Sequence, residues 1–327
     1  PHLGYHPGFS IFDAEDAKAL LQDLMLQEAT AEAGDELNDV QMTISAWKNA
    51  MRGPEQALSR AADEREQRIA RVYQRYNEYL KAYNAVDFDD LILLPVQLFR
   101  NCPDVLAKWR RKIRYMLVDE YQDTNLCQYE LVKLIVAERA AFTVVGDDDQ
   151  SIYAWRGARP ENLAQLKEDF PSLKIVKLEQ NYRSTGRILR CANTVIANNP
   201  HVFEKALWSD HTIGEEIRII RCRNEDAEAE RIATEILDHK LKNGLAFRDF
   251  AVLYRGNHQS RLLEMKLQAY QIPYRMSGGQ SFFAKNEIKD AMAYLRLLIN
   301  PDDDAAFLRV VNVPRREIGP RTLEQLS

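Results

Sequence analysis

Two apolar stretches of the sequence each end in closely spaced carboxylates, and these positions are the best suited to chemistry. The first stretch, residues 115–118, is followed at once by Asp119 and Glu120, and then by Gln122 and Asp123. In open α/β sheets, ligands bind beyond the carboxyl ends of the strands. One carboxylate there can hold Mg²⁺, and its neighbour can orient or deprotonate an attacking water. The alternative is that the acidic pair only caps the next helix, and the polar residues that follow argue against it.

The second apolar stretch, residues 142–145, ends in a glycine, three consecutive aspartates and Gln150. Because its amide is uncharged, Gln150 can hydrogen-bond a phosphate or a water without repelling either. Tyr153, Trp155 and Arg156 follow, and aromatic rings beside a cation suit stacking on nucleobases, at roughly 1–3 kcal/mol per base. Composition alone favours burial of the two aromatic residues in the core, because most aromatic side chains are buried.

Two later segments contain cations that suit phosphate groups. Within residues 177–184 a predicted strand ends, and Tyr182 and Arg183 follow it. An arginine has a fixed charge and forked donors that match a phosphate, and one delivered from a second domain would stabilise a transferring phosphoryl group. Residues 254–261 combine cations and amides that could line a phosphate backbone. A surface salt bridge is the simpler explanation for a single arginine, and residues 254–261 carry little weight alone.

The elements that must position these side chains change along the chain. In the first hundred residues, apolar side chains recur at helical spacing in four stripes, and Asp13 is a suitable N-cap for the first of them. No strand is predicted before about residue 112. After it, short β-rich stretches alternate with helical patterns, which predicts a parallel sheet covered on both faces. The predicted strands are residues 113–118, 142–145, 175–178, 217–222 and 250–254. From about Glu287 the pattern is helical again.

The composition of the chain excludes several classes of protein. The 327 residues are 46% apolar and 28% charged, which describes a folded chain long enough for two domains. The net charge of −5 excludes a uniformly basic nucleic-acid coat protein, although not a locally basic groove. The longest apolar stretch, residues 91–99, is about half the length that crosses a bilayer. Without a secretory signal, or cysteine spacing typical of zinc or disulfides, we expect a cytoplasmic protein with no membrane partner.

Taken together, these segments resemble the motifs of superfamily 1 DNA helicases of the UvrD/Rep/PcrA group, and most closely those of its Rep-type members. Motifs II, III, IV and IVa correspond, in order, to residues 118–124, 145–158, 180–184 and 253–261. Three further stretches favour the Rep type, namely residues 198–205, 277–283 and 300–304. The resemblance covers essentially the whole chain, and the order and spacing of the motifs are specific.

The resemblance implies an ATP-dependent DNA helicase that translocates 3′ to 5′ along single-stranded DNA and acts in DNA replication and repair. ATP and Mg²⁺ would be its cofactors, and single-stranded and forked DNA its substrates. The replicative helicase and replication-restart proteins would be candidate protein partners. By the same resemblance, Asp119 would coordinate Mg²⁺, Glu120 would activate the hydrolytic water and Gln150 would sense the γ-phosphate.

The remaining site residues are assigned by the same resemblance. Arg183 would contact the γ-phosphate across the domain cleft, Tyr182 would stack on the adenine, and Gln122 would belong to the nucleotide site. The residues expected to contact DNA are Tyr153, Trp155, Arg156, Arg255 and Asn257. One short loop would then hold a phosphate sensor and a base-stacking tryptophan, which offers a physical route from hydrolysis to a step along DNA.

The implied fold is α/β, with two RecA-like parallel-sheet motor domains (1A and 2A) and inserted helical subdomains (1B and the start of 2B). The expected plan is 1B at residues 1–100, 1A at 101–180, 2A at 181–278 and 2B at 279–327, each of them partial. The sequence contains no Gly-x-x-x-x-Gly-Lys-[Ser/Thr] loop, which cradles the β- and γ-phosphates. It also lacks the later motifs of the family. We therefore expect the middle portion of a helicase, inactive as these 327 residues alone.

Three alternatives stay open at this point. The first is a non-motor module that binds single-stranded DNA or a replication partner. The second is a helicase–nuclease subunit of related fold, although no nuclease domain is visible in the sequence. The third is a phosphate-binding ATPase unrelated to DNA, which the tyrosine and tryptophan of residues 145–158 disfavour.

Overall fold

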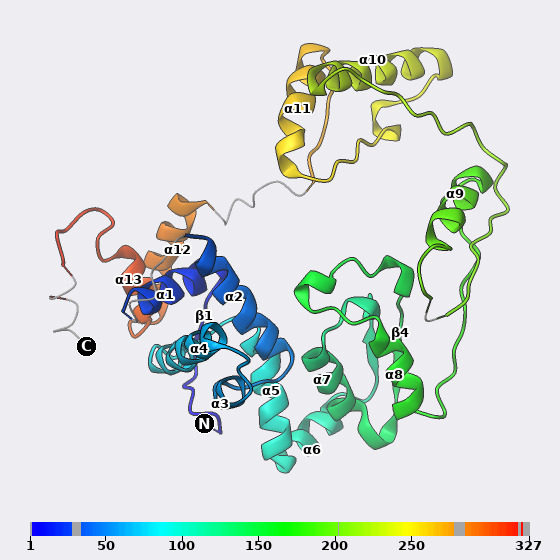
Figure 1. The fold of residues 1–327 in the computed structure, drawn as a ribbon. Coiled ribbons are helices and arrows are strands. Elements are labelled where there is room, and N and C mark those ends of the chain that lie inside the picture. The colour runs from blue at the N-terminus through cyan, green and yellow to red at the C-terminus, as the bar shows by residue number, and fades with distance from the viewer. Residues whose placement is uncertain (1, 28–33, 202, 278–284, 320–321, 323–327) are drawn as a thin grey trace. The chain divides into compact units, whose positions relative to one another are not determined.

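A computed structural model describes residues 2–27, 34–201, 203–277, 285–319 and 322. Its internal contacts divide the chain into two compact units, and Figure 1 shows the course of its helices and strands. The first unit consists of Pro1–Gly214 and Ile299–Leu308, and the second of Glu215–Leu298 and Arg309–Ser327. Part of the stretch 277–283, and the expected domain boundary at 278/279, lie outside the described residues.

The first part of the chain is helical, as predicted. Its helices are α1 (Ala14–Gln27), α2 (Gly34–Asn49), α3 (Pro54–Ser59), α4 (Glu64–Ala82), α5 (Asp90–Asn101) and α6 (Pro103–Lys112). Asp13 caps α1, because its side chain accepts the main-chain N–H groups of Glu15 and Asp16 at 2.9 and 3.0 Å. The apolar faces of α1, α2 and α4 bury a common core that includes the fully buried Leu24 and Tyr73.

The prediction that no strand precedes residue 112 is wrong. Strands β1 (Ser10–Ile11) and β2 (Ala85–Val86) pair in parallel, with Ser10 opposite Ala85. Each strand has only two residues, which is too short for an alternating apolar pattern to show in the sequence.

The two strands predicted beside the acidic segments are confirmed, although both are shorter than expected. Strands β3 (Met116–Val118) and β4 (Phe142–Val144) pair in parallel and in register. Helices α7 (Leu126–Val136) and α8 (Glu161–Asp169) contribute side chains to the same core, which includes Tyr129 from α7 and Leu166 from α8. This α/β arrangement agrees with the predicted fold class.

The other three predicted strands are wrong. Residues 175–178, 217–222 and 250–254 are extended, but no strand is assigned to them in the described part of the chain. A β-rich stretch becomes a strand only where a partner strand accepts its ladder of hydrogen bonds. Several of their apolar side chains stay in solvent, and Leu178 and Leu253 are 79% and 93% exposed, whereas Phe250 and Val252 pack against the core of α10 and α11.

The remaining helices are α9 (Gly186–Ile196), α10 (Glu225–Asn243), α11 (Ser260–Ala269), α12 (Asn286–Ile299) and α13 (Asp304–Val310). In the second unit, α10 and α11 pack together around Ala233, Ile236 and Leu267. The helical pattern predicted from Glu287 is confirmed by α12. Among the described residues, every helix is too short or too polar to span a bilayer.

Candidate functional site

The acidic residues of the site leave two strands at the same edge of the small sheet. Because β3 and β4 are parallel and in register, Asp119 and Asp147 emerge at their common carboxyl end. Glu120 has a left-handed backbone with φ of 50°, which turns the chain into the short helix Tyr121–Asp123. Such a conformation is uncommon for a residue with a side chain, although six other described residues of this chain besides glycines also have a positive φ.

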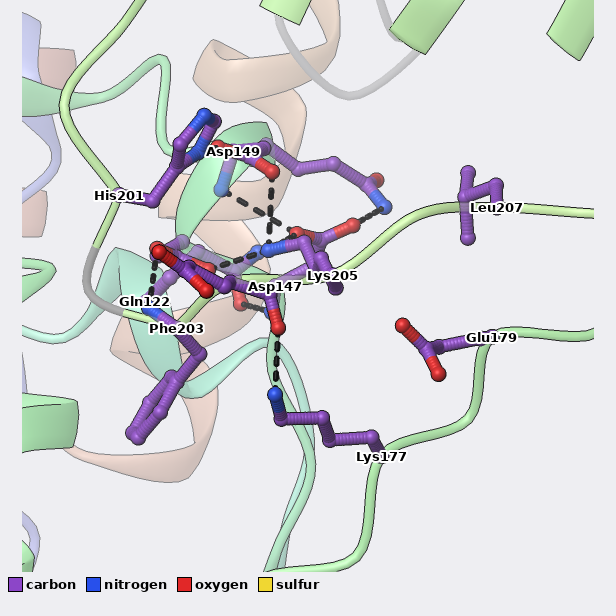
Figure 2. A network of polar contacts seen from close by, with 12 residues as sticks. Gln122, Asp147, Asp149, Lys177, Glu179, His201, Phe203, Lys205 and Leu207 are labelled. Carbon is purple, nitrogen blue, oxygen red and sulfur yellow. Dashed lines mark hydrogen bonds and ion pairs between the residues drawn. The ribbon is translucent and has the colours of Figure 1, made fainter. Parts of the chain in front are cut away.

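A chain of hydrogen bonds joins the two strand ends through the buried Gln122 (Figure 2). Gln122 Nε2 donates to Glu120 Oε2 at 2.7 Å, and Gln122 Oε1 accepts the Asp147 main-chain N–H at 3.0 Å. Asp147 Oδ2 then accepts Gln150 Nε2 at 2.7 Å. The carboxylate of Glu120 and the amide of Gln150 are therefore held by one continuous polar network, although their sequence positions lie in different motifs.

Gly146 allows this network to form. A Cβ atom at this position would lie 2.9 Å from Gln122 Oε1 and 3.3 Å from the main-chain nitrogens of Tyr121 and Gln122. Any side chain would therefore push β4 away from Gln122, and glycine is the residue that permits this close approach.

Asp119, Glu120 and Gln150 line one cavity of about 820 Å³ within the first unit. This volume is within the usual range for small-molecule sites. Asp119 is exposed, and its Oδ1 accepts the Glu120 main-chain N–H at 3.0 Å. An exposed carboxylate at the wall of a cavity fits Mg²⁺, which takes one or two carboxylates together with waters and phosphate oxygens.

Lys205 also lines this cavity and contacts three consecutive aspartates. Its ammonium lies 2.6 Å from Asp147 Oδ1 and 3.0 Å from Asp149 Oδ2, and it also bonds Asp148. Burial disfavours ionisation of Asp147, but hydrogen bonds from Lys205 and Gln150 outweigh burial and lower the pKa of its carboxyl. Burial likewise opposes the charge of Lys205, yet its hydrogen bonds to the aspartates raise its pKa.

Sequence reasoning gave Lys205 no role, although it lies in the stretch 198–205, because its partner Asp148 is 57 residues away in the sequence. The same reasoning gave His201 no ligand role. His201 Nδ1 lies 2.9 Å from Asp149 Oδ1, and ligand atoms of Asp148, Asp149 and His201 all lie within 4.8 Å of one another. The ammonium of Lys205 contacts these carboxylates and that of Asp147, so part of their charge is compensated within the protein.

Tyr182 and Arg183 do not join the cavity, since neither is among the described residues that line it. Both side chains are exposed, Tyr182 by 76%. The Asn181 side chain accepts the main-chain N–H groups of Arg183 and Ser184 at 3.0 and 2.8 Å, which forms a surface turn. Contacts of Tyr182 with adenine and of Arg183 with the γ-phosphate stay predictions.

The residues expected to stack on DNA form an exposed cluster beside the short helix Ala154–Arg156. Trp155 is 62% exposed, and the Arg156 guanidinium lies 4.4 Å from its ring centroid and 5.3 Å from that of Tyr153. The two rings are 6.4 Å apart. Burial of these aromatic residues, which composition alone favours, is therefore wrong. Exposed aromatic rings beside a cation are suited to stacking with unpaired bases.

An asparagine pair lies close to the end of this aromatic loop. Asn125, the N-cap of α7, donates from Nδ2 to Asn49 Oδ1 of α2 at 2.6 Å. Gly157, with φ of 84°, ends the loop where a Cβ would lie 3.8 Å from the Asn125 Cβ and 3.9 Å from the Asn49 Cβ. The segment after β3, the aromatic loop and α2 therefore meet at one point. Sequence reasoning missed Asn49, because its only relevant contacts are distant in sequence.

Arg255 and Asn257 lie in the second unit, on the exposed turn that precedes α11. Gln259 Oε1 accepts the main-chain N–H groups of Arg255 and Gly256 at 3.0 and 2.8 Å, which fixes the turn. The side chains of Arg255 and Asn257 are exposed, and their contact with a DNA backbone stays a prediction.

Comparisons with known proteins agree with the resemblance seen in the sequence. The chain matches the UvrD/REP helicase N-terminal domain family over residues 1–171 and the UvrD-like helicase C-terminal domain family over residues 176–327. It is 56% identical to the "ATP-dependent DNA helicase Rep" of Escherichia coli (strain K12), and 42% identical to the "ATP-dependent DNA helicase PcrA" of Staphylococcus aureus (strain Mu50 / ATCC 700699). These matches cover 99% of this chain but 48% and 44% of the two relatives. The chain thus spans about half the length of the curated relatives it matches.

Proposed function

Because the chain belongs to the UvrD/Rep helicase family, we propose that the protein that carries it is an ATP-dependent DNA helicase of the Rep type. Its proposed action is translocation 3′ to 5′ along single-stranded DNA and unwinding of forked duplexes. The observation that carries this proposal is that Asp119, Glu120 and Gln150 line one cavity while Trp155, five residues further on, is exposed beside a cation.

The geometry supports distinct roles for the three cavity residues. When bound, ATP supplies the phosphoryl group that is transferred to water, and Mg²⁺ offsets charge on its phosphates. Asp119 would hold the ion from the cavity wall. Glu120, oriented by the Gln122 amide, would take the proton of the attacking water. Gln150 would donate its amide to the terminal phosphate.

In this proposal Gln122 holds other residues of the nucleotide site in place and does not itself contact the nucleotide. It is 1% exposed, and both ends of its amide are engaged, by Glu120 and by the Asp147 main chain. Tyr182 and Arg183 would enter the site from a second motor domain. The proposed plan is 1B at residues 1–100, 1A at 101–180, 2A at 181–278 and 2B at 279–327. The two matched families adjoin between residues 171 and 176, near the proposed boundary of the motor domains.

Nucleotide turnover would reach DNA through the short segment between Gln150 and Trp155. A shift of Gln150 toward a phosphate would pull on the loop that carries the stacking cluster. The loop ends at Gly157, close to the hydrogen-bonded pair Asn49 and Asn125. Replicative helicase and replication-restart proteins are the proposed protein partners.

The full-length protein provides the test of this proposal. We expect ATP hydrolysis that single-stranded DNA stimulates, and unwinding of a duplex with a 3′ tail but not of the same duplex with a 5′ tail. DNA binding without any ATP turnover would contradict the proposal and favour the non-motor module. ATP turnover that DNA leaves unchanged would favour an ATPase unrelated to DNA.

Replacing Trp155 by alanine should weaken binding of single-stranded DNA by about 5-fold to 150-fold, which corresponds to the roughly 1–3 kcal/mol of one stacked base. Fluorescence anisotropy of a labelled oligo-dT at fixed salt measures this affinity. Trp109→Ala is the matched control, because Trp109 is also exposed beside a cation, Lys112 at 4.9 Å, but lies on α6. Equal losses in both variants, or none in Trp155→Ala, would rule out the stacking role.

A further inference from the structure

We propose that Lys205 is a positioning residue for Gln150, and that it acts by fixing the carboxylate of Asp147. The inference rests on the proposed function, since it takes Gln150 to be the residue that meets the terminal phosphate. It adds a route by which the part of the chain that matches the C-terminal helicase domain, residues 176–327, acts on a sensor in the N-terminal part.

The central observation is that Asp147 is engaged at both oxygens. Lys205 Nζ lies 2.6 Å from Oδ1, and Gln150 Nε2 donates to Oδ2 at 2.7 Å. A charge-assisted hydrogen bond is about twice as strong as a neutral one. Asp147 Oδ1 also accepts the main-chain N–H of Asp149 at 3.2 Å. The lysine therefore adds the charged contact to a carboxylate that the main chain already orients, and the carboxylate sets where the Gln150 amide points.

Charge gives Lys205 a second effect on the same side chain. Asp147, Asp148 and Asp149 are consecutive, and their carboxylates converge on the ammonium of Lys205, whose side chain is 19% exposed. If the ammonium were removed, three carboxylates would repel one another in a partly buried place. One of them would then rotate away or take up a proton. Either change would release the Gln150 amide from its present acceptor.

The main chain around Lys205 is tied down on both sides, so the ammonium is delivered by a fixed segment (Figure 2). Before it, the main-chain N–H of Phe203 donates to Asp148, and the Glu204 carbonyl accepts Lys177 Nζ. After it, the main-chain N–H of Ala206 donates to the Glu179 carboxylate at 2.9 Å. A displacement of this segment would move Lys205 with it, and Asp147 would follow.

The test uses the DNA-stimulated ATPase of the full-length protein. For Lys205→Met we expect kcat to fall by about 10-fold to 100-fold, the loss typical of a misplaced group, while KM for ATP is unchanged. Lys205→Arg should recover most of the loss, because it keeps the charge. A Lys205→Met variant with the same kcat as the wild type would overturn the proposal. So would a raised KM at normal kcat, which would instead indicate direct contact with the nucleotide.

A double-mutant cycle separates this positioning role from a general loss of stability. If Lys205 acts through Asp147, combining Lys205→Met with Asp147→Asn should reduce kcat no further than Asp147→Asn alone. Fully multiplicative losses would contradict the proposed route. Should Lys205→Met melt well below the wild type, Lys205→Gln replaces it in the cycle, since glutamine keeps a hydrogen-bond donor at the same place.

Lys133→Met is the matched control, because it removes another lysine–aspartate pair, that with Asp169 at 2.8 Å, on the far end of α7 from the strand ends. Its kcat should equal that of the wild type. Different results would refute the helicase assignment and the proposed role of Lys205. A wild-type protein without DNA-stimulated ATP turnover would refute the helicase assignment, whereas an active wild type with an equally active Lys205→Met variant would refute only the role of Lys205.

Discussion

Glu120→Gln should lower the DNA-stimulated ATP turnover of the full-length protein by about 100-fold to 10,000-fold, the range for loss of a general base. Binding of single-stranded DNA should survive. The substitution keeps the size of the side chain and an oxygen that can accept the 2.7 Å hydrogen bond from Gln122. It removes only the ability to take a proton from water. Steady-state ATP hydrolysis and oligo-dT anisotropy on the same preparation measure both quantities.

Glu130→Gln is the matched control for this experiment. Glu130 lies on α7 and pairs with Arg100 at 2.8 Å, so the same change there removes an ion pair without touching the strand ends. Its turnover should equal that of the wild type. Undiminished turnover in Glu120→Gln would overturn the assigned role, and a parallel loss of DNA binding would assign Glu120 to the architecture of the site rather than to its chemistry.

Lys48→Met should lower the free energy of unfolding of the helical region by about 3–5 kcal/mol, the usual cost of breaking a buried ion pair. Lys48 is fully buried, and its ammonium lies 2.7 Å from Asp87 and 2.8 Å from Asp90. The Tyr76 hydroxyl also donates to Asp87, at 3.0 Å. Methionine fills the space but leaves two buried carboxylates without a counter-charge.

The pH dependence of this loss has a definite sign. Burial raises the pKa of Asp90 to about 6, although Lys48 opposes the rise, so removing Lys48 should raise the pKa further. A carboxyl whose pKa is higher in the folded state than in the unfolded state binds a proton on folding, and it therefore adds stability as the pH falls through its folded pKa. The gap between wild type and Lys48→Met should thus be widest above the raised pKa of Asp90 in the variant, shrink as the pH falls toward about 6, and stay constant below it.

The first thermal unfolding transition of the full-length protein, measured above and below pH 6, checks both the loss of stability in Lys48→Met and its dependence on pH. A multidomain chain does not unfold in one step, so the first transition is compared rather than a global value. Lys133→Met again serves as control, because a partly exposed pair such as Lys133–Asp169 contributes only about 0–1 kcal/mol. A Lys48→Met variant as stable as this control, or a gap that widens as the pH falls, would contradict the stabilising role of the buried ion pairs of Lys48.

Local features of the site could be predicted from the sequence. An apolar run that ends in acids marks β3 and β4, and parallel pairing then brings Asp119 and Asp147 to one edge. The apolar stripes of the helices and the capping of α1 by Asp13 also involve residues that are close together in the sequence. Each depends on residues within a few positions of one another, which is the range over which periodicity and capping carry information.

Features that depend on distant partners could not be predicted. The roles of Lys205 and Asn49 depend on contacts with residues more than fifty positions away. The sequence around each of them does not predict these contacts. The β-rich residues 175–178 look like a strand in sequence, but strand formation needs a neighbouring strand that periodicity does not supply. The exposure of Trp155 also contradicts the compositional expectation, and only the resemblance to helicase motifs predicted it.

The in-register pairing of β3 with β4 limits how this part of the protein can evolve. Side chains alternate between the two faces of a strand, so one residue added to β4 would reverse the faces and carry Gly146 away from Gln122. Substitutions in the strands can be absorbed by repacking, whereas changes of length cannot. Insertions and deletions among homologues should therefore accumulate in the turn at residues 137–141, and the spacing from Phe142 to Gln150 should be constant.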